Sequence, residues 1–161
     1  MRARELEIWL DDDANTAGVW RKSVLVQARR GALDPRLFLQ GEAFLDDARR
    51  SRVPVGMLAV VEAGAPLPSQ EVRRQQRALI DRFGAYEQAR IAAVVLGDDV
   101  GAILARGAAR LVGVANPRIE RFVEVTPAVS WLAHELSALG LPTRASELFG
   151  AIEAARRQGG A

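Results

Sequence analysis

The hydrophobic residues at the start of the chain alternate with polar ones. Residues 4–10 place Leu6, Ile8 and Leu10 on one side, which is the period of a strand with one buried face. The opposite side is polar except for Trp9. Large aromatic side chains away from a core face are enriched at interfaces. We therefore expect Trp9 either to be covered by the next strand or to belong to an interaction surface of an edge strand, as in a homodimer.

The next segment predicts a turn, a second strand and a helix. The acidic residues 11–15 are typical of a turn, and the apolar stretch from about 19 to 28 predicts a strand antiparallel to the first. Asp34 and Pro35 predict a helix start, because aspartate caps the first turn and proline there loses no hydrogen bond. This helix is expected to reach about Arg50.

From residue 55 onward the pattern changes to a short apolar run followed by a helical segment, repeated three times. The runs and the residues that start the following helices are 55–61 with Ser69, 91–96 with Asp98, and 122–125 with Thr126 and Pro127. The second run is apolar on both faces, as in a strand covered by helices on both sides. Alternating strands and helices favour parallel pairing, because parallel strands need long crossover connections.

These elements predict an α/β fold. We expect a mixed, mostly parallel sheet of about five strands, with an N-terminal antiparallel pair and four to five helices. A further helix over about 143–158, capped by Thr143, follows the last unit. No composition break or linker interrupts the chain, so residues 1–161 are expected to form a single domain.

Composition excludes several kinds of chemistry. The 161 residues are 49% apolar and 26% charged, as in an ordinary globular domain. Cysteine is absent, which excludes disulfide scaffolds, thiolate metal sites and cysteine nucleophiles. His134 is the single histidine, on an amphipathic helix, and is expected to be structural rather than a general base. No catalytic residue, cofactor or metal is therefore predicted.

The high isoelectric point, about 9.9, does not predict a nucleic-acid partner. The chain has 22 basic and 20 acidic residues, and a net charge of only +2. Arg73, Arg74 and Arg77 lie on the exposed side of their predicted helix without interleaved aromatic residues. We expect this side to meet a protein partner rather than nucleic acid.

Location is predicted from what the chain lacks. Its longest apolar runs are far below the roughly 18 residues that span a bilayer, so we expect no membrane insertion. The first residues contain no apolar signal core, so cytoplasmic residence is expected.

Two loops at predicted strand ends carry candidate chemistry. Glu62 follows the run 55–61, and Asp98 and Asp99 follow the run 91–96, which would bring the three carboxylates to one edge of a parallel sheet as a ligand site. The alternative is that both aspartates only cap a helix. Ser69 is either a phosphoacceptor at a helix start or a plain N-cap.

The order of elements and three local patterns resemble the STAS-like (anti-sigma-factor-antagonist-like) fold, in the divergent form common in bacterial proteins. The patterns are the loop 61–69 before an amphipathic helix, the Ala-rich segment after residue 96, and the passage 122–132, which contains Trp131. In that family a serine in an Asp-Ser loop is phosphorylated. Here the matching region lacks the Asp-Ser pair, and only Ser69 stands at the helix start.

The resemblance implies a non-enzymatic regulatory domain that acts by binding a protein. The alternative is a small-molecule-binding protein or a hydrolase-like enzyme that uses the acidic residues at the carboxyl ends of the parallel strands.

Overall fold

The computed structural model describes residues 5–98, 106 and 116–159, and it has an α/β fold. One six-stranded sheet has its strands side by side in the order of the sequence. The strands are β1 (Leu6–Asp11), β2 (Asn15–Trp20), β3 (Val24–Arg29), β4 (Val55–Val61), β5 (Ala89–Val95) and β6 (Ile119–Phe122). The first three pair antiparallel, and β3 to β6 pair parallel. The predicted fold class, a mixed and mostly parallel sheet, is confirmed.

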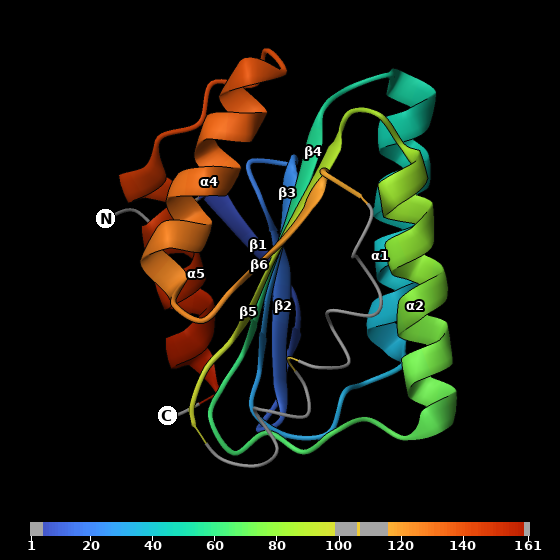
Figure 1. Cartoon of the computed structure of the whole chain (residues 1–161), viewed down its shortest axis with the longest axis vertical. Coiled ribbons are helices and arrows are strands. Elements are labelled where there is room, and N and C mark those ends of the chain that lie inside the picture. Colours follow the sequence, from blue (N-terminus) through green and yellow to red (C-terminus); the bar gives the residue numbers. More distant parts are fainter. Residues whose placement is uncertain (1–4, 99–105, 107–115, 160–161) are drawn as a thin grey trace.

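Helices cover both faces of this sheet. Figure 1 shows α1 (Arg36–Ser51) and α2 (Gln70–Ala85) on one face and α4 (Val125–Ala138) and α5 (Ala145–Gln158) on the other. Right-handed crossovers between strands that advance in one direction keep their helices on one face, and α1 and α2 obey this rule. After β6 the chain reverses, so that α4 packs on β4 and β5 and α5 reaches back to β2 and β3.

The predicted second strand is in fact two strands joined by a tight turn. Arg21 and Lys22 both have positive φ, 50° and 58°, and the Ser23 amide donates to the Trp20 carbonyl over 3.0 Å. This geometry is a hairpin turn in which both central residues are left-handed, a conformation that favours Asn and Gly. Because neither residue occurs there, the sequence conceals the turn. The sheet therefore has six strands, where about five were expected.

A bulge in β1 changes the side on which Leu10 lies. Ile8 pairs with Gly18 and Leu10 with Ala17, so Trp9 is an extra residue between them. An extra residue shifts the alternation of side chains, so that Trp9 and Leu10 both pack toward the α1 face. The expectation that Leu10 shares a face with Leu6 is therefore wrong.

The helix starts agree only in part with prediction. The Arg36 amide donates to the Asp34 carboxylate over 2.9 Å, so Asp34 accepts a hydrogen bond from the first turn of α1, although Pro35 and not Asp34 is the residue directly before the helix. By contrast, α4 begins at Val125, one residue before Thr126. Helix α5 follows Arg144 and has no capping hydrogen bond from a side chain, so Thr143 does not cap it. The helix predicted from Asp98 falls outside the described residues.

The sheet separates two apolar layers. The larger layer lies under α4 and α5, where Leu58, Leu132 and Leu148 are fully buried. At Gly56 a side-chain carbon would lie 3.0 Å from the Leu136 Cδ1 atom, so the glycine lets α4 approach β4 closely. The other layer lies under α1 and α2 and includes Phe83. Within residues 5–98 and 116–159, no helix is both long and apolar enough to cross a bilayer.

Candidate functional site

A cavity of about 190 Å³ lies between the sheet and the helices α1 and α2. Its floor is formed by side chains that point to this face from β2 to β6. Its roof comes from α1, α2 and the loop before α2, including Leu37, Phe38, Leu67 and Leu79. The lining is largely apolar.

The floor is hollow because small residues align across the sheet. Ala17 on β2 pairs with Gln27, Gln27 with Ala59, Ala59 with Ala93, and Ala93 with Arg121 on β6. Three alanines in one row leave space beneath the helices. Two residues earlier on strands β3 to β6, the side chains on the same face are large. They are Leu25, Met57, Ile91 and Ile119. The change from large to small side chains along the strands therefore creates the cavity.

The polar groups of the cavity are mostly cationic. Arg29, Arg73, Arg77 and Arg121 line it together with two glutamines, and none of the described lining residues is acidic. Arg73 and Arg77 are exposed residues of α2, so they stand at the mouth of the cavity. The cavity therefore has positive charge both inside, at Arg29, and at its mouth, at Arg73 and Arg77.

Arg29 is the buried member of this group. It ends β3, and only 5% of its surface is exposed. Its Nη1 atom donates to the Pro66 carbonyl over 2.5 Å and to the Gly31 carbonyl over 3.1 Å. Burial lowers the pKa of its guanidinium, because desolvation disfavours the charged form. Arg29 therefore connects the loops that follow β3 and β4 at the edge of the cavity.

The three carboxylates predicted at the strand ends do not share one environment. Glu62 follows β4 and accepts two hydrogen bonds from Arg156 of α5, over 2.5 and 3.1 Å. The Glu62 hydrogen bond, the largest contribution, raises the pKa of Arg156. Asp98 is exposed, and Asp99 lies outside the described residues. Among residues that the structure describes, no group of three or more histidine, aspartate or glutamate side chains could hold a metal ion.

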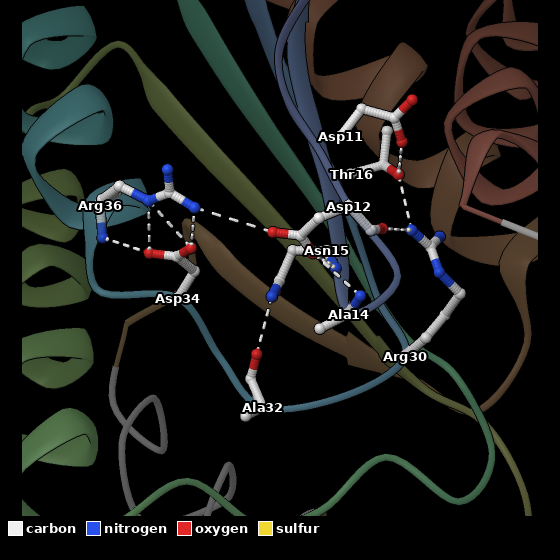
Figure 2. Close-up of polar contacts among 9 residues, drawn as sticks. All are labelled: Asp11, Asp12, Ala14, Asn15, Thr16, Arg30, Ala32, Asp34 and Arg36. Atoms are coloured by element: carbon white, nitrogen blue, oxygen red, sulfur yellow. Dashed lines mark hydrogen bonds and ion pairs between the residues drawn. The ribbon is translucent and has the colours of Figure 1, made fainter.

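The acidic turn between β1 and β2 is held by its own hydrogen bonds (Figure 2). The Asp12 carboxylate accepts from the amides of Ala14 and Asn15, over 2.9 and 2.8 Å. Asp11 accepts from the Thr16 hydroxyl, to which Arg30 also donates. These contacts explain the acidic residues as parts of a turn, as predicted.

The remaining candidates lie on or near α2 and β1. The Val72 amide donates to the Ser69 hydroxyl over 3.3 Å, which confirms Ser69 as an N-cap; its phosphorylation stays a prediction. Arg74 is exposed and does not line the cavity, unlike Arg73 and Arg77. Trp9 lines the cavity and makes an edge contact with Phe44, with ring centres 6.2 Å apart.

Helix α4 carries two residues that the sequence singled out, His134 and Trp131. His134 is exposed, although a structural histidine beside the buried stripe was expected. Trp131 is half-buried and packs against Phe122, with ring centres 6.0 Å apart. Neither residue lines the cavity.

The alanine row and Arg29 were not predicted as parts of a site. Ala59 and Ala93 are small residues inside apolar strands, at positions that alternate with Leu58, Val60 and Val94 on the packed face. The signal in the sequence that could have indicated a site was a charged residue, Arg29, at the end of an apolar run. The alignment of residues from different strands depends on their register, which one sequence does not reveal.

The comparisons with known proteins give no family. No protein-family model matches the chain, and no curated protein matches it. Among solved structures, the chain is similar to the beta subunit of P. aeruginosa geranyl-CoA carboxylase, with 16% identity and a TM-score of 0.43. The match covers 97% of this chain and 33% of that one, so this chain spans about a third of that subunit.

Proposed function

We propose that this protein is a non-enzymatic binding domain that takes a small, largely apolar ligand between its sheet and the helices α1 and α2. The observation that carries the proposal is the row of alanines Ala17, Ala59 and Ala93, which leaves a cavity inside an apolar layer. Protein interiors are close-packed, and unfilled space loses dispersion contacts. A ligand in the cavity would restore those contacts.

The volume defines the size of the ligand. An apolar cavity of about 150 Å³ in another protein accommodates benzene. A cavity of about 190 Å³ therefore suits one aromatic ring, or a branched aliphatic group, with a short substituent.

The contacts and exposure of Glu62 and Asp98 support binding without catalysis. Glu62 is engaged by both Nε and Nη2 of Arg156, so its carboxylate is not available as a general base. Asp98 is exposed to solvent and does not line the cavity. A hydrolase-like site built on these carboxylates therefore has less support than simple binding.

Regulation of a protein partner is the second candidate function, and it rests on the STAS-like resemblance. It is favoured by the α2 surface, where Ser69, Arg73, Arg74 and Arg77 are all exposed beside the cavity mouth. A ligand could then alter a surface that a cytoplasmic partner contacts. Affinity capture with wild type and an Arg74→Glu variant tests this role, and a partner retained equally by both would contradict it.

Homodimerisation is a further part of this candidate function. Strand β1 pairs only with β2 in the described part of the chain, so its outer edge is available to a second copy. Light scattering over a range of concentrations tests this idea. A mass that stays that of one chain at all concentrations would contradict it.

Methyl NMR tests the binding proposal directly. With alanine methyl groups labelled, millimolar benzyl alcohol or benzoate should shift the signals of Ala59 and Ala93, while Ala92 on the opposite face shifts little. Ala93→Leu should abolish the effect by filling the cavity. Ala78→Leu makes the same change on an exposed position of α2 that does not line the cavity, and it should bind like wild type. No shift with either probe, or equal shifts in both variants, would overturn the proposal.

A further inference from the structure

Arg29, at the end of β3, differs in its ion pairing from three other arginines of the chain, which contact carboxylates. Arg156 is paired with Glu62, and Arg36 is paired with Asp34 and Asp12 (Figure 2). Arg82 is paired with Glu42 and Asp46. Arg29 is more buried than any of these, yet no carboxylate within residues 5–98 and 116–159 lies at ion-pair distance from it. Its charge lacks a partner of opposite sign in this part of the chain.

A buried guanidinium without a counter-ion is costly, because its charge is removed from water without a compensating negative group. The two carbonyls that Arg29 contacts both accept from the same nitrogen, Nη1. A guanidinium has five N–H donors arranged as a planar fork. The donors on Nε and Nη2 make no hydrogen bond with other described residues, and they belong to a side chain that lines the cavity.

From this geometry we infer that the ligand is a small monocarboxylate whose charged group pairs with Arg29 while its apolar body lies over Ala59 and Ala93. The inference rests on the proposed binding function. A carboxylate matches the planar fork of a guanidinium with two parallel hydrogen bonds. Ion pairs are stronger for buried groups than for exposed ones, and only 5% of the Arg29 surface is exposed. The volume limits the apolar body to about the size of one aromatic ring.

The other cationic residues of the site support an anion. Arg73 and Arg77 stand at the mouth of the cavity. They lie four positions apart on α2, with Gln76 three positions from Arg73, so all three residues share the side of the helix that faces the cavity. Like-charged groups around an opening raise the local concentration of an anion and favour its entry. With no acidic residue among the described lining, a carboxylate meets no repulsion there.

A pair of probes that differ in charge tests the inference on the unaltered protein. Benzoate and benzamide have nearly the same shape, and isothermal titration calorimetry at pH 7 measures the binding of each. We expect benzoate to bind about tenfold to a hundredfold more tightly, as is typical of a hydrogen-bonded charge. The Nε–H signal of Arg29 in ¹⁵N NMR should shift with benzoate. Equal affinity for both probes would overturn the inference while leaving the binding function in place.

Variants locate the effect at one side chain. Arg29→Met should reduce the preference for benzoate to near that of benzamide, and Arg29→Lys should retain part of it. Arg49→Met, an exposed position of α1 outside the cavity, is the matched control and should bind like wild type. If Arg29→Met does not fold, the Arg29→Lys variant and the wild-type probe pair still decide the question. The inference would be contradicted if Arg29→Lys kept the full preference for benzoate and if benzoate left the Arg29 Nε–H signal of the wild-type protein unmoved. If the wild-type protein bound neither probe, the proposed binding function would be contradicted as well.

Discussion

The two faces of one sheet are built differently, although the same strands supply both. On the α4 and α5 face, β4 presents Leu58 and Val60, and both are essentially without exposed surface. On the α1 and α2 face, the residue between them is Ala59, and it lies in the floor of the cavity. Strand β5 repeats the arrangement with Ala93 between Ala92 and Val94.

The two faces therefore have different roles, one in stabilising the fold and the other in binding. A close-packed layer with interlocked leucines stabilises the sheet through buried apolar area and dispersion contacts. A layer with a hollow gives up some of that stabilisation and gains a volume that a ligand can fill. We infer that the packed face carries the fold, so that the other face can hold the cavity.

The largest expected effect is a truncation in the packed face. Leu132 of α4 has no exposed surface, so Leu132→Ala should lower the free energy of unfolding by about 2 to 5 kcal/mol. Leu39→Ala is the matched control, because Leu39 is 71% exposed and its loss should cost under about 0.5 kcal/mol. Urea unfolding measures both. Similar losses in the two variants would contradict the assignment of stability to this face.

A smaller effect is expected at the ion pair that joins β4 to α5. Only 22% of the Glu62 side chain and 25% of the Arg156 side chain are exposed. Glu62→Gln should cost about 1 to 2 kcal/mol, because it removes the charge that joins β4 to α5 and leaves Arg156 only Glu153 of its own helix as an ion-pair partner. Asp47→Asn breaks an exposed pair with Arg50 and should change stability by under about 0.5 kcal/mol. If the two variants are equally stable, the Glu62 pair does not anchor α5.

The cap of α1 gives an effect that depends on pH. The hydrogen bond from the Arg36 side chain, above all, lowers the pKa of Asp34 below its usual value. Asp34→Ala should therefore cost about 0.5 to 1 kcal/mol at pH 7. A lowered carboxyl pKa stabilises the fold above about pH 4, and this contribution is lost as the pH falls through the lowered pKa. Unfolding of both proteins at pH 7 and at about pH 2.5 measures this. A difference that persists unchanged at the lower pH would contradict the role of the ionised carboxylate.

The sequence predicts the fold more fully than the site. Strand β4 was predicted with its observed ends, because Val55–Val61 is a continuous apolar run between Pro54 and a polar loop. The turn at Arg21 and Lys22 was missed, because its left-handed residues are not those that favour such a turn. The cavity requires Ala59 and Ala93 to be neighbours, which follows from strand register and not from either strand alone.

The central claim is that one face of the sheet is full and the other is hollow, and neighbouring alanines on β5 test it most directly. Ala92 is fully buried under α4, whereas Ala93 lines the cavity. Ala92→Leu should destabilise the protein by about 1 to 3 kcal/mol through overpacking, and Ala93→Leu should change the free energy of unfolding by under about 1 kcal/mol. Equal destabilisation by the two substitutions in urea unfolding would contradict the account.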